Sequence, residues 1–203
     1  MDRSRAAQPF LFVGNHPCLD FINTEMILEG RRTDLLVEPT DLIHWLVQAK
    51  VIGRDEGKGM GPERAELEKL LKETKMFRAV LRETAERIAA NKPVPGSTIE
   101  AVNQLLSRRQ GYPQLLRMTG GFKQIFYSSA EGPGRLLALL AETASDLLCN
   151  ADLSLVKKCR NNVCILYFYD TTKNHARQWC SMQLCGNRMK VAAHYQRKRF
   201  KQP

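Results

Sequence analysis

Acidic side chains are nearly missing from the last quarter of the 203-residue chain. Residues 157–203 hold one of them, Asp170, beside eleven lysines and arginines, while residues 1–156 hold twenty of each sign. The whole net charge of +10 therefore lies in this last segment. Such an asymmetry points to a polyanionic partner. The alternative is a solvated basic tail, but a plain tail would not carry four cysteines as well.

Long apolar runs are also missing. None reaches the ~18 residues that a membrane-spanning helix requires, and the run near the N-terminus, FLFV at residues 10–13, is shorter than the ~7–15 apolar residues of a secretory signal. We therefore expect a cytoplasmic protein that contacts no membrane. Thiols stay reduced in that compartment, so clustered cysteines favour a metal site over disulfides.

Several motifs of catalysis are absent from the sequence. It contains no Gly-x4-Gly-Lys-Ser/Thr loop, no Gly-x-Gly-x-x-Gly and no Gly-x-Ser-x-Gly. Neither His16 nor His44 has a partner that can be recognised in sequence. We therefore expect a protein that is not an enzyme, with no catalytic residues.

Four of the six cysteines form two pairs with the same internal spacing. Cys159-x4-Cys164 is followed by fifteen residues and then by Cys180-x4-Cys185. Zinc prefers four such ligands in a tetrahedron, and an interval of ~12–20 residues lets the chain return as a short ribbon. Four Cys ligands leave no open position, so we predict one structural Zn²⁺. The alternative is four buried free thiols.

The residues around these cysteines fit the same interpretation. The aromatic stretch ILYFYD at 165–170 can line the ribbon and TTKN at 171–174 can turn it. Four thiolates around a divalent cation leave a net negative centre, which nearby cations would offset. Those cations are Lys158, Arg160, Arg177 and Arg188. Cys18 and Cys149 are single, and we expect both to be ordinary core residues.

A basic helix is expected directly after the last cysteine. Gly186 permits a tight turn, Asn187 is a favourable N-cap, and the thirteen residues that follow contain no Gly or Pro. One stripe, formed by Met189, Ala193, Gln196 and Phe200, is suited to packing on the metal site. We predict nucleic-acid contacts from the outward side chains Asn187, Arg188, Lys190, His194, Arg197, Lys198, Arg199 and Lys201, and from Lys173 and Arg177 ahead of the helix. For Arg188, a structural role near the thiolates remains an alternative.

The remaining residues predict a mostly helical domain with a small sheet. Apolar periodicity favours helices over residues 39–52, from Pro62 to about residue 90, and over 131–150. Ser97 and Glu100 predict a capping box for a further helix. The sequence TGG at 119–121 predicts a hairpin over 113–128, and residues 10–13 resemble a short strand.

The fold class is therefore α+β. We expect a mostly helical N-terminal domain with a small hairpin or sheet, residues 1–155. A four-Cys zinc ribbon or knuckle that ends in the basic helix follows as residues 156–203. The charge boundary and the end of the preceding helix both predict that two semi-independent parts join near residues 150–157.

The stretch LDFINT at residues 19–24 allows two interpretations. Asp20, Asn23 and Thr24 are polar residues among apolar neighbours, and they could orient a small ligand in a pocket wall. The alternative is structural, because Asn and Thr cap helix ends and turns. The structural interpretation is the preferred one.

Two stretches resemble a known family. The C-terminal WCSMQLCGNR, with YDTTKN and RQW ahead of it, resembles the bacterial CGNR-type zinc fingers. The N-terminal GNHPCLDFINTE resembles the start of the ABATE domain that precedes this finger. The resemblance implies that Cys159, Cys164, Cys180 and Cys185 are metal ligands and that Asn187 and Arg188 belong to the signature. It also implies a stress-related transcription regulator whose first domain senses a small ligand and whose finger binds DNA.

Three functions follow from different classes. The first is a ligand-responsive transcription regulator that binds double-stranded DNA and a small-molecule effector. The second is an RNA-binding or ribosome-associated zinc protein, because phosphate contacts do not depend on base sequence. The third is an enzyme with a structural zinc finger. The oligomeric state stays open, and a homodimer is one of the alternatives.

Overall fold

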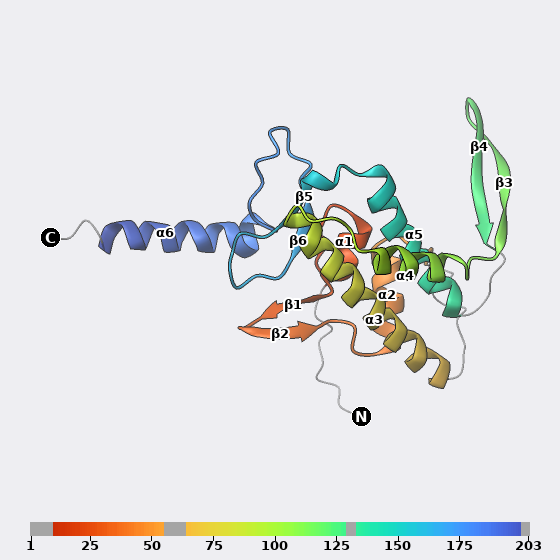
Figure 1. Cartoon of the computed structure of the whole chain (residues 1–203), viewed down its shortest axis with the longest axis horizontal. Helices are drawn as coiled ribbons and strands as arrows, with labels where there is room; N and C mark the ends of the chain where they lie inside the picture. The colour runs from red at the N-terminus through yellow and green to blue at the C-terminus, as the bar shows by residue number, and fades with distance from the viewer. Residues whose placement is uncertain (1–9, 55–63, 129–132, 200–203) are drawn as a thin grey trace.

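The structure is a computed structural model that describes residues 10–54, 64–128 and 133–199 (Figure 1). Its first part contains the helices α1 (Pro17–Ile22), α2 (Pro39–Gln48), α3 (Arg64–Ala89), α4 (Gly96–Leu106) and α5 (Pro133–Asn150). Two antiparallel hairpins interrupt them, β1 (Glu25–Leu28) with β2 (Arg31–Asp34) and β3 (Gly111–Met118) with β4 (Gly121–Ser128). The predicted α+β class, mostly helical with small sheets, is confirmed.

The second part is short and contains the cysteines. A 3₁₀ turn η1 (Leu153–Leu155) leads into β5 (Val156–Lys158), which pairs antiparallel with β6 (Tyr167–Tyr169). A π-helical turn η2 (Met182–Gly186) then runs directly into α6 (Asn187–Arg199). Figure 1 shows α6 extending away from the rest of the molecule, at the end opposite to the β3–β4 ribbon.

The core of the first part is built around the short helix α1. Five of its six residues are buried, because the sequence PCLDFI is apolar on nearly every side and other helices surround it. Phe21 packs on Trp45 of α2 with ring centroids 5.4 Å apart. The apolar stripes of α3 and α5 complete this core through the side chains Leu70, Leu71, Phe77, Leu81, Ile88, Leu136, Leu137, Leu140, Ala144 and Leu147.

Most of the predicted helices are present, but some of their ends differ. The helix predicted to reach residue 52 ends at Gln48, because Lys50 adopts a φ of 58° that stops the helix. The capping box predicted at Ser97 and Glu100 is wrong. The helix α4 begins at Gly96 after the extended Pro95, so Ser97 already lies inside it, and no side chain caps it. The predicted starts at Pro62 and at residue 131 lie outside the described residues.

The strand expected at residues 10–13 is wrong as well. This segment has no regular secondary structure. Its apolar side chains are instead anchored from two sides, with Phe12 stacked near Trp45 and Val13 packed against the cluster around the cysteines. The first hairpin, β1–β2, was not predicted. Its turn places Glu29 and Gly30 at φ values of 49° and 81°, and Gly at the second of these positions is a recognisable signal.

The second hairpin is confirmed. It pairs Gly111 with Ser128 at the base and Met118 with Gly121 at the tip, so that Thr119 and Gly120 form the turn. Gly120 has a φ of 91°, which glycine adopts without a steric penalty.

Candidate metal centre and basic helix

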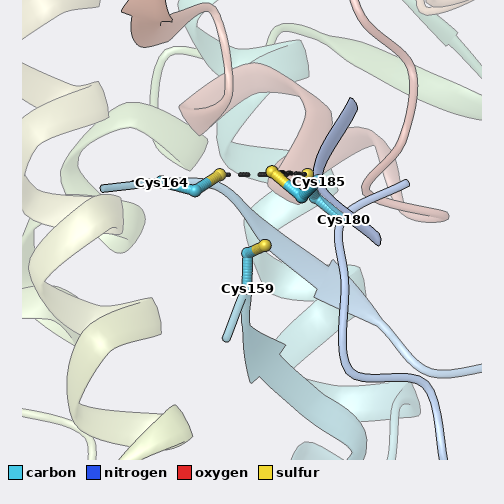
Figure 2. Close-up of side chains that lie close together, drawn as sticks. All are labelled: Cys159, Cys164, Cys180 and Cys185. Atoms are coloured by element: carbon cyan, nitrogen blue, oxygen red, sulfur yellow. Dashed lines mark hydrogen bonds between the residues drawn. The ribbon is translucent and has the colours of Figure 1, made fainter. Parts of the chain in front are cut away.

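The four paired cysteines converge on one point. Their sulfur atoms all lie within 4.8 Å of one another, with 3.8 Å between Cys164 and Cys180 and 3.6 Å between Cys180 and Cys185 (Figure 2). A tetrahedron with Zn–S bonds of ~2.3 Å places its sulfurs about 3.8 Å apart. The donor set and its spacing therefore fit one zinc ion, as the sequence predicted.

Each pair of cysteines is held by a backbone turn. Cys164 donates its N–H to the carbonyl of Asn161 over 2.8 Å, and Cys185 donates its N–H to the carbonyl of Ser181 over 3.0 Å. Cys159 follows β5 and donates its N–H to Leu166 over 3.0 Å. These hydrogen bonds therefore help to set the direction of the sulfurs in the folded finger.

Asn161 joins the two turns. Its side-chain amide donates to the sulfur of Cys185 over 3.3 Å, while its side-chain oxygen accepts from the N–H of Val163. The residue is buried. A donor to the sulfur stabilises a thiolate, so Asn161 supports the metal site without being a ligand. Asn161 was not predicted, although Asn often bonds the backbone two residues further on in an Asx turn, as Asn161 does here with Val163.

The thiols depend on one another for their charge. A hydrogen bond to the thiol of Cys164 lowers the pKa of Cys159, and the same bond raises the pKa of Cys164 to about 12. Four adjacent sulfurs cannot all lose their protons unless a cation offsets the charge. A bound Zn²⁺ supplies that charge, and all four residues then act as thiolates.

Asp170 is the one acidic residue among residues 157–203, and its carboxylate forms hydrogen bonds within the protein. Its side chain is fully buried and accepts from Lys157 Nζ over 2.6 Å, from the Thr172 hydroxyl over 2.6 Å and from the Arg177 N–H over 3.0 Å. Burial raises the pKa of this carboxyl, but these hydrogen bonds outweigh it and hold the pKa well below its usual range. Asp170 therefore fixes the loop that presents Lys173.

Arg177 is directed inward. Its guanidinium donates to the carbonyls of Val13 and Trp179 over 2.7 and 3.0 Å, and to that of Cys180, and it lies 4.1 Å above the Phe168 ring. These contacts tie the N-terminal segment to the second cysteine pair. A nucleic-acid contact of Arg177 stays a prediction that competes with this structural role.

The start of the basic helix differs from the expectation. Asn187 is not the N-cap, because it has helical backbone angles and the helical chain already begins at Met182. Ser181 is the cap, and its hydroxyl accepts from the N–H groups of Gln183 and Leu184. Gly186 does not form the predicted tight turn. It is buried in the π-turn, where an added Cβ would lie 2.5 Å from the Met182 sulfur.

The predicted nucleic-acid residues lie mostly on exposed positions. Asn187, Arg188, Lys190 and His194 are exposed on α6, and Lys173 is exposed at the tip of the 171–174 turn, which is present as predicted. Only the backbone of α6 is described at Arg197, Lys198 and Arg199, and the same is true of Ala193 and Gln196. Phe200 and Lys201 lie outside the described residues. Met189 is half-buried, as expected for the inner stripe.

The polar residues of LDFINT form hydrogen bonds inside the protein. Asp20 accepts from the Gly14 N–H over 2.7 Å, and Asn23 bonds both the carbonyl and the N–H of Tyr167. Thr24 donates to Phe21 and accepts from Arg78. All three residues are buried. These contacts give each a structural role, and ligand binding by them stays a prediction.

Two arginines one turn apart on α3 bind neighbouring segments, and one of them reaches the finger. Arg78 forms a two-pronged ion pair with Asp34, at 2.7 Å for each prong. Arg82 donates to the carbonyls of Glu25 and Ile165, each over 2.9 Å, and to that of Ile22. Since Ile165 follows the first cysteine pair, Arg82 joins α3 directly to the metal site. Two arginines at i and i+4 among apolar residues were the overlooked sequence signal.

The two remaining cysteines differ in burial. Cys18 is buried, as expected, and burial raises the pKa of its thiol to about 12. Cys149 is exposed, so the expectation that it belongs to the core is wrong. It lies near the end of α5, where the turn of the helix directs it away from the buried stripe.

Two known protein families match the chain, one over each of its two parts. A family described as "Putative stress-induced transcription regulator" (ABATE) matches residues 15–151, and the CGNR zinc finger matches residues 156–198. The chain belongs to the ABATE family. The ABATE match contains α1 to α5, and the CGNR finger contains the four converging cysteines, so one structural zinc ion is supported by both family and geometry. A comparison with curated proteins finds no match.

Among the described residues, none of the helices combines the length and the apolar character needed to cross a membrane.

Proposed function

We propose that the chain is a ligand-responsive bacterial transcription regulator that binds double-stranded DNA through its CGNR finger. The observation that carries the proposal is a groove of about 980 Å³ that both predicted basic elements share. Lys173 from the loop and Lys190 from α6 line it together with Asn174 and Gln178, and none of the described residues that line it carries a carboxylate. A phosphate chain fits such a lining.

The shape of α6 supports the same proposal. The helix has thirteen residues, or about 20 Å at 1.5 Å per residue, and it stands clear of the ABATE domain (Figure 1). The major groove of B-DNA is about 12 Å wide and admits a single helix. With the zinc site holding its first turn, α6 can enter the groove while Lys173 and Arg160 face phosphates beside it.

A second basic hollow adjoins the finger. It is about 340 Å³ in volume, and its lining includes Lys157, Lys158, Arg160 and His175. The ammonium of Lys157 already binds Asp170, whereas Arg160 is exposed. We assign Arg160 and Lys158 to the phosphate contacts of the same DNA-binding surface.

The effector site is proposed in the groove between α2 and α3. This groove measures about 930 Å³ and combines apolar walls from Leu67, Leu71 and Met76 with three cations, Arg64, Lys72 and Lys75, which outnumber its two carboxylates, Glu38 and Glu68. An amphipathic carboxylate fits both features. Lys75 pairs with Asp34 over 3.2 Å, and Asp34 pairs with Arg78 on α3, one turn before Arg82. An anion that competes for Lys75 therefore perturbs the helix that holds Ile165 of the finger.

The two alternative functions, an enzyme and an RNA-binding protein, have less support. Four cysteine ligands leave the zinc no open position for substrate, so we propose a structural metal and no enzymatic activity. We place the protein in the cytoplasm, where the thiols stay reduced. An RNA-binding role uses the same cations and is separated from DNA binding by experiment.

The test compares duplex DNA with double-stranded RNA of the same sequence at matched salt, by fluorescence anisotropy. The zinc-loaded chain is expected to bind DNA more tightly, and selection from a random pool should enrich one DNA motif. Chelation of zinc should abolish the preference. Tighter binding to RNA, or enrichment of no DNA motif, would overturn the proposal.

A further inference from the structure

The ribbon of β3 and β4 stands away from the helices of the ABATE domain (Figure 1). Its eight residue pairs form an uninterrupted antiparallel ladder, and within the described residues neither of its edges pairs with another strand. A single two-stranded hairpin is marginally stable in water, and open edges are ready to pair with another chain. A ribbon of this length is therefore expected to have a partner that covers it.

Both faces of this ribbon carry several apolar side chains. A hairpin with one face in water normally alternates apolar and polar residues. Here Leu115 lies across from Gln124 and diagonally between Phe122 and Phe126 on one face. The side chains of Leu115 and Phe122 are 66% and 64% exposed. The other face carries Tyr112, Leu116, Met118, Ile125 and Tyr127. Contiguous exposed apolar side chains mark an interaction surface.

The charges of the ribbon argue against a polyanionic partner. Residues 101–130 contain no acid, but three of their four cations are engaged within the chain, and the fourth, Lys123, is exposed on the face that does not carry Leu115. Arg108 pairs with Glu73, and Arg109 pairs with Glu142 while its guanidinium lies 3.5 Å above the Phe126 ring. The guanidinium of Arg117 lies over Phe122. What the ribbon presents is apolar surface and open backbone edges, which an equally apolar ribbon complements.

We infer that this partner is a second copy of the chain and that the β3–β4 ribbon is its dimerisation element. Two ribbons related by a two-fold axis present the same surface to each other, so the faces with Leu115 and Phe122 pack together. Each strand of eight residues is about 27 Å long. A face two strands wide, or about 10 Å, then covers roughly 270 Å² on each ribbon, well below the ~800 Å² per partner of a standard specific interface, so the dimer is expected to be weak and reversible. The finger and α6 lie at the far end of the molecule and stay outside the contact.

Sedimentation velocity of the full, zinc-loaded chain tests this inference without any DNA. The wild type should pass from monomer to dimer as its concentration rises through the micromolar range. The double variant Leu115→Glu/Phe122→Glu should weaken the association at least tenfold. Ile99→Glu is the matched control, because Ile99 is also an exposed apolar residue, with 45% exposure, but lies on α4. It should dimerise like the wild type.

A cross-link keeps the inference testable if the double variant disturbs the ribbon itself. Gln124→Cys, in a Cys149→Ser background, places a thiol opposite Leu115 and should form a disulfide between two chains under mild oxidation. Glu100→Cys, on the exposed side of α4, should not. The inference is overturned if the wild type is monomeric at every concentration. It is equally overturned if the double variant dimerises like the wild type, or if the ribbon variants lose DNA affinity with no change in association.

Discussion

The side-chain amide of Asn161 donates a hydrogen bond to the sulfur of Cys185 over 3.3 Å, although the two residues are 24 positions apart in the chain. The bond joins the turn of the first cysteine pair to that of the second. Local turns direct each pair of sulfurs, and this bond, together with the bond from the Arg160 N–H to the Gln178 carbonyl over 2.9 Å, joins the two pairs. The metal site is therefore supported by groups that are not metal ligands.

Replacing Asn161 by Ala should weaken zinc binding without removing a ligand. Loss of a hydrogen bond to a ligand typically costs about 10–100-fold in metal affinity, and competition with a chromophoric chelator measures it. Asn162→Ala is the matched control, since this neighbouring Asn is exposed and should leave the affinity unchanged. Equal affinities for both variants would show that Asn161 does not support the site.

Replacing the ligand Cys180 by Ser should unfold the finger and leave the ABATE domain folded. Structural zinc supplies about 10–16 kcal/mol to small modules, far more than the few buried side chains around the cysteines can supply. Hydrogen exchange should then show lost protection over residues 156–186 and retained protection in α3 and α5. If the finger keeps its protection, zinc is not what folds it. If α3 and α5 lose theirs too, the two predicted parts fold as one unit.

Arg82→Ala should loosen the contact between α3 and the finger. It leaves the carbonyls of Ile22, Glu25 and Ile165 without this donor, at a cost of roughly 1–3 kcal/mol for each buried unpaired group. We expect thermal unfolding at a lower temperature and faster proteolysis near residues 150–157. Arg87→Ala should have a much smaller effect, because the Arg87 guanidinium bonds the Pro93 carbonyl at the exposed surface. Similar losses in both variants would contradict this role.

The buried Asp20 should make stability fall between about pH 4 and pH 6. Burial raises the pKa of this carboxyl to about 6, although the Gly14 N–H partly offsets the shift. The unfolded chain releases the proton near pH 3.8, before the folded chain does, so rising pH favours unfolding across this window. Asp20→Asn keeps an acceptor for Gly14 and should flatten the change, by up to about 3 kcal/mol. Parallel pH profiles from denaturant titrations of the two proteins would refute the shift.

The elements that the sequence predicts well are those defined by neighbouring residues. The cysteine spacing identified all four ligands, and the apolar periodicity located the long helices. The predictions fail where contacts with residues distant in the sequence determine the local structure. Residues 10–13 read locally as a strand, yet Phe12 and Val13 are held by a helix and by the finger. From the sequence Arg177 is expected to be a surface cation, but its guanidinium points inward because it donates hydrogen bonds to carbonyls of two separate segments.

The cap of α6 shows the same limit at short range. The Asn187 side chain is suited to capping a helix. However, the residues before it, Met182–Gly186, already form a π-helical turn that contains the ligand Cys185, and Ser181 is the cap. Asn161 could be suspected from its turn, but its contact with Cys185 depends on the folded finger.

Salt dependence of DNA affinity tests the central claim, that the finger and α6 bind duplex DNA, most directly. Each phosphate neutralised contributes about 0.9 to the slope of log affinity against log salt. Lys190→Ala should therefore lower the slope by about one and weaken binding to every sequence, while Lys72→Ala, on the ABATE domain, should leave the slope unchanged. Equal slopes for the wild type and Lys190→Ala, or no salt-dependent binding to any duplex, would contradict the account.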